Sequence, residues 1–130
     1  MIELLLGISA VAGPQSCDGS QRELNECAAQ FYRQAARQLN RQWPKTLAAL
    51  KRNDKQLSAW PSYEGASADT LLKAQRAWLA YREQSCQTEA RISAGTIAPM
   101  NYYICMWRMT RARTEELQKL TLNPNSGEPL

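Results

Sequence analysis

Residues 86–105, with the sequence CQTEARISAGTIAPMNYYIC, decide the fold of this chain. A helical pattern fills both ends of the stretch, while Gly95 interrupts it and Pro99 suits the first turn of a new helix. The midpoint between Cys86 and Cys105 falls at this turn, so an antiparallel helical hairpin brings both cysteines to the same height. The stretch therefore predicts two antiparallel helices joined by a short turn and a disulfide.

The cysteines supply a second constraint. The chain of 130 residues contains four, and pairing Cys86 with Cys105 leaves Cys17 and Cys27 to tie the N-terminal segment onto the first helix. Four cysteines allow three pairings, and the sequence leaves a cross-pairing such as Cys27 with Cys86 open. An even count in a small chain is typical of disulfide-bonded proteins, so we expect a periplasmic or secreted protein.

Apolar residues recur at three- and four-residue steps on both sides of the turn, which is the period of an α-helix. We expect one helix from about residue 69 to 92 and another after Pro99. The predicted buried face of the first contains Leu71, Leu72, Gln75, Trp78, Leu79, Arg82 and Cys86. The predicted buried face of the second contains Met100, Tyr103, Trp107, Thr110, Leu117 and Leu120.

A longer helix precedes this hairpin. Its apolar face continues from Leu24 to Leu50, behind a Ser20 that suits the N-cap position. Pro44 lacks an N–H and its ring clashes with the carbonyl four residues earlier, so we expect a kink there. Because strand-like alternation is absent, the sequence predicts an all-α fold, a small disulfide-stabilised bundle of three main helices with the first long and kinked at Pro44.

The length indicates one domain with two flanking segments. Residues 1–12, MIELLLGISAVA, resemble a signal peptide or its remnant, because a short apolar run ends in a small-x-small pattern. The alternative is an apolar N-terminal segment that packs on the domain. The run is too short to be a transmembrane span. We expect the helical domain over residues 13–122 and a flexible tail over residues 123–130, which contain two prolines and a glycine.

The composition removes most catalytic chemistry. The chain contains no histidine, so it lacks an imidazole base, an imidazole metal ligand and any Ser-His or Cys-His dyad. A zinc site would need all four cysteines, and their spacings of 10, 59 and 19 residues lack the close pairs that such sites use. The sequence thus predicts a protein that is not an enzyme and holds no metal or cofactor.

A net charge of +4 is compatible with binding to acidic surfaces. Arginines gather at Arg108, Arg111 and Arg113, but acidic residues accompany them in the same helix. This mixture of signs does not favour nucleic-acid binding.

The hairpin helices resemble a known bacterial family. The matching motifs are LKAQRAWLAYR at 72–82 closing at Cys86, GTIAPM at 95–100, Cys105 and TRARTEEL at 110–117, with LNECA at 24–28 and Leu39-Asn40 upstream. This is the LprI-type, lysozyme-inhibitor-like domain family of secreted and envelope proteins. The resemblance covers roughly residues 17–120 and implies an α-helical, disulfide-bonded, extracytoplasmic domain. The family takes its name from lysozyme inhibition by a member.

Four residues of these motifs are expected to form a structural network, because buried amide and guanidinium groups can lock a small bundle. They are Gln75, Trp78, Arg82 and Arg113. A contact role for the same residues is the alternative.

Two functions remain compatible with the sequence. The first is an extracytoplasmic binding protein that inhibits lysozyme by steric occlusion of its cleft, which holds two catalytic carboxylates. The residues expected to contact the partner lie in the hairpin turn and are Arg91, Ser93, Gly95 and Thr96. The alternative is an envelope structural or interaction domain that binds peptidoglycan, an acidic glycan or another envelope protein through its basic face.

Overall fold

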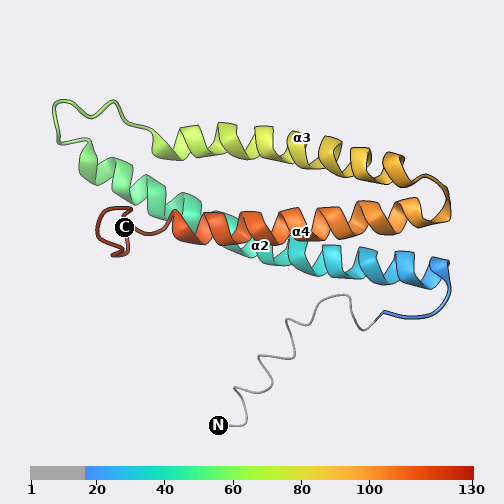
Figure 1. The fold of residues 1–130 in the computed structure, drawn as a ribbon. Coiled ribbons are helices and arrows are strands. Elements are labelled where there is room, and N and C mark those ends of the chain that lie inside the picture. The colour runs from blue at the N-terminus through green and yellow to red at the C-terminus, as the bar shows by residue number, and fades with distance from the viewer. Residues whose placement is uncertain (1–16) are drawn as a thin grey trace, which may run out of the picture.

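The computed structural model describes residues 17–130, and the expected leader at residues 1–12 lies outside them. Three long helices dominate this part of the chain (Figure 1). They are α2 (Gln21–Leu57), α3 (Ser67–Ser93) and α4 (Ala98–Lys119), with a short 3-10 helix, η2 (Gly95–Ile97), between the last two. No strand forms within residues 17–130. The predicted all-α bundle and its antiparallel hairpin are confirmed.

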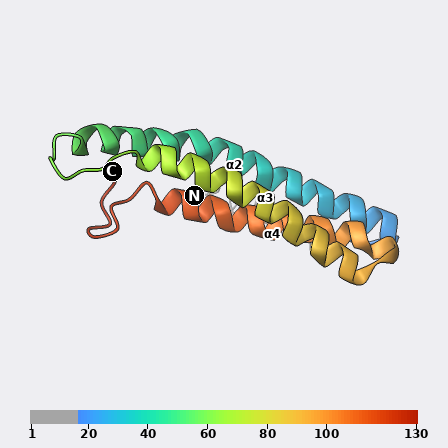
Figure 2. The same ribbon diagram turned by 90° about the horizontal axis from the view of Figure 1, so that it is seen from above.

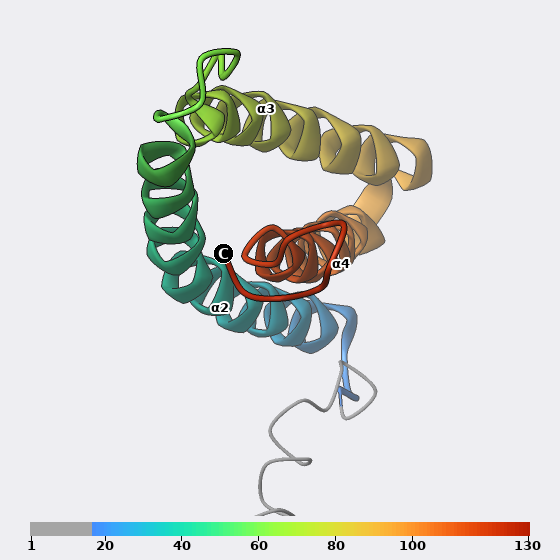
Figure 3. The ribbon, with the colours of Figure 1, turned by 90° about the vertical axis from the view of Figure 1, so that its left-hand side faces the viewer.

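The first helix, α2, is continuous from end to end. The hydroxyl oxygen of Ser20 accepts a hydrogen bond from the backbone N–H of Glu23 at 3.2 Å, which is the expected N-cap. Pro44 lies inside the helix on its exposed side, where its missing N–H leaves one backbone carbonyl without its helical partner. The helix bends over its middle, in keeping with the expected kink, and curves around α4 (Figure 3).

Helices α2 and α4 run parallel to each other, and α3 runs antiparallel to both along the same long axis (Figure 2). Near the start of α2, Phe31 packs edge to face on Trp107, with ring centroids 6.5 Å apart. Further along, the hydroxyl of Thr46 donates to the carbonyl oxygen of Leu117 at 2.8 Å. These contacts hold α4 against α2 over much of its length.

Buried side chains form two clusters. One gathers towards the α2–α3 connection and contains Leu39, Leu50, Ala68, Leu71 and Leu117. The other lies towards the hairpin turn and contains Cys86, Cys105 and Met106. Alanines occupy much of the inner face of α2, and their small side chains permit close packing of the helices.

Three leucines assigned to buried faces are exposed, and this part of the prediction was wrong. The exposed fractions are 37% for Leu72, 42% for Leu79 and 40% for Leu120. Helix α3 packs mainly on α4 and touches α2 less, so only a narrow face of α3 is covered. Leu71 and Gln75 lie on that face and are buried, whereas Leu72 and Leu79 lie beside it.

Asp54, near the end of α2, caps the start of α3. One carboxylate oxygen accepts hydrogen bonds from the backbone N–H of Ser67 at 3.0 Å and from its hydroxyl at 2.6 Å. The other accepts from the backbone N–H of Ala68 at 3.0 Å, and the Tyr63 hydroxyl also donates to Asp54. Burial alone would raise the pKa of Asp54, but these hydrogen bonds outweigh it and lower the pKa to about 2. The carboxylate supplies the cap that Ala66, directly before α3, cannot.

The C-terminal segment folds back on the bundle. The backbone N–H of Asn123 donates to the carbonyl oxygen of Glu128 at 2.7 Å, and that of Leu130 donates to Thr121 at 2.9 Å. Leu130 packs against the buried cluster at this end. Residues 123–130 thus form a hydrogen-bonded turn, and the terminal leucine meets an apolar surface built by distant residues. The flexibility expected for this segment stays a prediction.

Candidate functional site at the hairpin turn

The hairpin turn, residues 91–97, forms one end of the bundle (Figure 1). The sequence predicted four contact residues there, and the structure brings all four to the exposed surface of this turn. They are Arg91, Ser93, Gly95 and Thr96. Ile92, which the sequence analysis did not single out, is 80% exposed in their midst. The turn therefore presents a cationic, a hydroxyl and an apolar group together.

The backbone of the turn takes an unusual path. Ala94 has φ 52° and ψ 178°, a conformation that glycine adopts readily and that strains a residue with a Cβ. Gly95 follows with φ 70°, and a Cβ there would meet nothing within 4 Å, so the conformation alone requires glycine. An outlier such as Ala94 persists only when its surroundings hold it in place.

One hydrogen bond from α2 holds the turn, and a disulfide fixes the same end of that helix. The side-chain amide of Asn25 donates to the carbonyl oxygen of Thr96 at 3.0 Å. The disulfide between Cys17 and Cys27, with Cα atoms 5.9 Å apart, ties the segment before α2 onto the same end of the helix. The Asn25 hydrogen bond thereby links the turn to α2, in addition to α3 and α4, the two helices that the turn connects.

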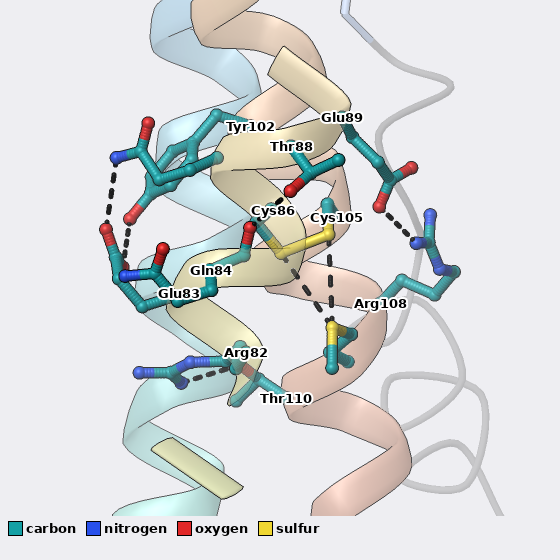
Figure 4. The surroundings of a disulfide bond; sticks show 12 residues. Arg82, Glu83, Gln84, Cys86, Thr88, Glu89, Tyr102, Cys105, Arg108 and Thr110 are labelled. Carbon is teal, nitrogen blue, oxygen red and sulfur yellow. Dashed lines mark hydrogen bonds and ion pairs between the residues drawn. A yellow bond between two sulfur atoms is a disulfide. The ribbon is translucent and has the colours of Figure 1, made fainter. Parts of the chain in front are cut away.

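The second disulfide joins α3 to α4, the helices that lead into and out of the turn (Figure 4). Cys86 and Cys105 have Cα atoms 5.4 Å apart, and both side chains are fully buried. The pairing favoured from the sequence is therefore the one in the structure. Across the same helix pair, Arg108 forms an ion pair with Glu89 at 2.8 Å.

A polar contact joins α3 to α4 near this disulfide. The hydroxyl of Tyr102 donates to Glu83 at 2.6 Å, and the amide of Gln87 donates to the other oxygen of the same carboxylate at 3.1 Å. These hydrogen bonds lower the pKa of Glu83, whereas burial and the nearby carboxylate raise the pKa of Tyr102. The carboxylate therefore stays charged and the phenol stays protonated at neutral pH.

A shallow depression of about 270 Å³ adjoins the turn. Its lining residues are Glu89, Ile92, Ser93, Asn101 and Ile104. It joins the exposed turn to the outer faces of α3 and α4, so a partner that covers the turn would also meet this mixed surface.

The four motif residues lie elsewhere, at the middle of α3 and in α4. Two guanidinium groups lie over the Trp78 ring, with Arg82 Cζ at 4.9 Å and Arg113 Cζ at 5.7 Å from its centroid. Arg113 donates to Gln75 at 2.9 Å, and Arg82 donates to the buried hydroxyl of Thr110 at 3.0 Å. The structure thus joins Gln75, Trp78, Arg82 and Arg113 in one network across the α3–α4 interface.

This network lies apart from the turn. Arg91 follows Arg82 by nine positions, which corresponds to about 13 Å along a helix. The guanidinium of Arg82 also lies over the Tyr32 ring of α2, 5.6 Å from its centroid. Arg82 therefore contacts all three helices, an arrangement suited to holding the bundle together.

Within residues 17–130, one group of side chains has the spacing of a metal site, namely Cys86, Glu89 and Cys105. Both cysteines are joined in a disulfide, whereas a metal ligand must be a thiolate. The group therefore offers no sulfur ligand in this state, and its disulfide serves the hairpin.

Fold and surface together define a small helical module that is cross-linked by two disulfides and presents a turn held by α2. The chain belongs to the family described as "Lysozyme inhibitor LprI", whose sequence profile matches residues 12–117. It is also 37% identical to the uncharacterized protein R02472 of Rhizobium meliloti (strain 1021), over 92% of this chain and 91% of that protein. No solved structure matches the chain significantly.

Both disulfides fit the extracytoplasmic location that the sequence predicted. Within residues 17–130, no helix combines the length and the hydropathy that crossing a membrane requires.

Proposed function

We propose that this protein is a periplasmic or secreted, non-catalytic inhibitor of lysozyme, and that the hairpin turn at residues 91–97 occludes the lysozyme cleft. Membership of the LprI family supports inhibition as the activity. The single observation that supports the turn as the contact surface is its anchoring: the Asn25–Thr96 hydrogen bond and the two disulfides all act on this end of the bundle.

Anchoring matters because association costs free energy for each loop and side chain that becomes ordered. A turn already fixed in the free protein avoids much of that cost. The strained backbone at Ala94 also indicates a turn whose path is imposed by the bundle. The surface therefore has the preorganisation that steric inhibitors of enzymes require.

The chemistry of the turn suits a cleft that contains two carboxylates. The side chain of Arg91 is exposed and forms no ion pair within residues 17–130. Ile92 adds an apolar surface that is almost fully available to a partner. In the proposed complex Arg91 faces the catalytic carboxylates and Ile92 packs against the cleft wall.

The net charge of +4 leads to a prediction for the rate of association with a lysozyme that is itself basic. Long-range repulsion slows association at low salt, and salt screens that repulsion over about 10 Å at 0.1 M. The association rate constant is therefore expected to rise with ionic strength while the bound complex is held by short-range contacts.

Inhibition kinetics test the proposal. Occlusion of the cleft predicts inhibition that is competitive with a soluble oligosaccharide substrate and complete at saturating protein. Full lysozyme activity at saturating protein would overturn the proposal, and so would inhibition that a saturating substrate does not relieve.

A further inference from the structure

A second surface lies away from the hairpin turn, in a groove between α2 and α4. It contains a polar pocket of about 220 Å³. The lining residues are Gln38, Arg41, Gln42 and Lys45 from α2 with Thr114 and Gln118 from α4. The occlusion of a lysozyme cleft by the turn makes no use of these side chains.

The pocket carries uncompensated positive charge. Arg41 and Lys45 lie one helical turn apart, and neither side chain forms an ion pair or hydrogen bond within residues 17–130. Like charges at this spacing repel each other and disfavour the helix slightly. No lining residue is acidic, and Glu115, beside Thr114 on α4, lies outside the pocket. An anionic group bound between the two cations would relieve the repulsion.

Three side-chain amides and the hydroxyl of Thr114 form the rest of the lining. Gln42 is held in place because its side-chain N–H donates to Thr46 at 3.1 Å, and the hydroxyl of Thr46 in turn donates to Leu117. The side chains of Gln38 and Gln118 have no partner within residues 17–130. Each free amide offers donors and an acceptor, which suits a ligand rich in hydroxyl and acetamido groups.

An aromatic ring continues the same face. Trp107 precedes Thr114 by seven residues, which is two helical turns and about 10 Å, so both lie on one side of α4. Phe31 precedes Gln38 by the same interval on α2 and contacts Trp107. The Arg111 guanidinium lies over the Trp107 ring, 5.2 Å from its centroid. The face thus runs from an aromatic ring with an arginine to the amide-lined cationic pocket.

We propose that this α2–α4 face binds a glycan whose amino sugars carry carboxylate groups. The carboxylate lies between Arg41 and Lys45, the amides of Gln38 and Gln118 bind hydroxyl or acetamido groups, and a neighbouring sugar lies against Trp107. This assigns the acidic-glycan alternative of the sequence analysis to a defined surface. It is independent of the turn, so the protein can bind an acidic glycan and a lysozyme at separate places.

Calorimetric titration of the full disulfide-bonded chain tests the proposal. The probe is a soluble glycan of alternating N-acetylglucosamine and N-acetylmuramic acid, which carries a carboxylate on every second sugar. The neutral control is a chitooligosaccharide of equal length, and the anionic control is polyglutamate. We expect the acidic glycan to bind at least tenfold more tightly than either control. Equal or tighter binding of polyglutamate or of the neutral glycan would overturn the proposal.

Matched variants locate the site. Arg41→Gln with Lys45→Gln should weaken binding of the acidic glycan at least tenfold. Lys73→Gln with Arg76→Gln removes the same charge from the exposed side of α3 and should change it less than twofold. An equal loss of affinity for the acidic glycan in the two double variants would show that net charge alone drives binding, contrary to the proposal.

A third variant separates the glycan from a generic anion. Gln38→Ala should weaken glycan binding about threefold or more, and an unchanged affinity would count against the assigned pocket. Circular dichroism confirms that each variant is folded. The variant Arg41→Gln with Lys45→Gln should inhibit lysozyme as well as the unaltered protein does. Loss of glycan binding would therefore leave the proposal of lysozyme inhibition unaffected, and the reverse also holds.

Discussion

Asn25 and Thr96 are joined by a hydrogen bond of 3.0 Å between a side-chain amide of the first helix and a backbone carbonyl of the hairpin turn, 71 residues further along the chain. This contact links the surface proposed to meet lysozyme with the start of α2, which is distant in sequence but lies at the same end of the bundle. It acts beside the Cys17–Cys27 disulfide, which fixes the start of the same helix. The turn is thus held by side chains that a hairpin alone does not contain.

Asn25→Ala removes this tether and leaves the disulfides intact. The hydrogen bond is exposed, so the free energy of unfolding should fall by only about 0.5–1.5 kcal/mol. Amide hydrogen exchange should accelerate in residues 95–98 and remain unchanged at the centre of α3. Inhibition of lysozyme should weaken several-fold. Unchanged exchange in the turn would show that the tether contributes nothing to its order.

Ala94→Gly relieves the backbone strain at the turn. Because φ 52° with ψ 178° is readily adopted only by glycine, the variant should be more stable by about 1 kcal/mol, which corresponds to a rise in Tm of about 4 °C. Gly95→Ala should have the opposite effect, since its φ is 70°. Thermal denaturation followed by circular dichroism measures both. A loss of stability in Ala94→Gly would contradict the strain assigned to this residue.

Asp54→Asn weakens the cap of α3. Two backbone N–H groups and two hydroxyls lose a charged acceptor, so we expect a loss of about 1–2 kcal/mol at pH 7. The variant retains a side-chain carbonyl that accepts hydrogen bonds, and Asp54→Ala should therefore be less stable still.

The Asp54 cap should also make the stability of the protein depend on pH. The pKa of Asp54 falls from 3.8 to about 2 on folding, so its contribution is fully present above about pH 5 and is lost as the pH falls towards 2. The stability difference between the unaltered protein and Asp54→Asn should therefore shrink over this range. A difference that stays constant from pH 7 to pH 2 would exclude the charged cap.

Arg82→Ala tests whether the motif network is structural. Arg82 donates to a buried threonine and lies over the rings of Tyr32 and Trp78, so its removal should lower the free energy of unfolding by about 2–3 kcal/mol. Lysozyme inhibition per folded molecule should stay the same, because the network lies about 13 Å from the turn. Chemical denaturation measures the first quantity, and titration of active inhibitor measures the second. A stable variant that fails to inhibit would place Arg82 in the contact surface.

Local patterns in the sequence predicted most of the fold. Helical periodicity, Gly95 and the symmetric placement of Cys86 and Cys105 predicted the hairpin and the favoured disulfide pairing, both of which the structure contains. The exposed Leu72 and Leu79 were misplaced because periodicity does not reveal how wide a face the neighbouring helices cover. Of the polar residues predicted on the same face, Gln75 is buried and Arg82 is half-buried and donates to the buried Thr110.

The remaining features depend on contacts between distant residues. The Asp54 cap needs the α2–α3 connection to bring it to Ser67, and the Asn25 tether needs α2 to lie beside the turn. The exposed turn residues could be predicted because they follow directly from the break at Gly95. The cationic pocket could not, since Arg41 and Gln118 become neighbours only when α2 and α4 pack in parallel.

Lysozyme inhibition by matched surface variants tests whether the hairpin turn is the inhibitory surface. Arg91→Glu with Ile92→Glu changes the turn, and Arg76→Glu with Tyr81→Glu makes the same change in charge at exposed positions of α3 that lie nearer its start. We expect the unaltered protein and the second pair to inhibit equally, and the first pair to inhibit at least tenfold more weakly while remaining folded. Equal inhibition by both pairs, or no inhibition by the unaltered protein, would contradict this expectation.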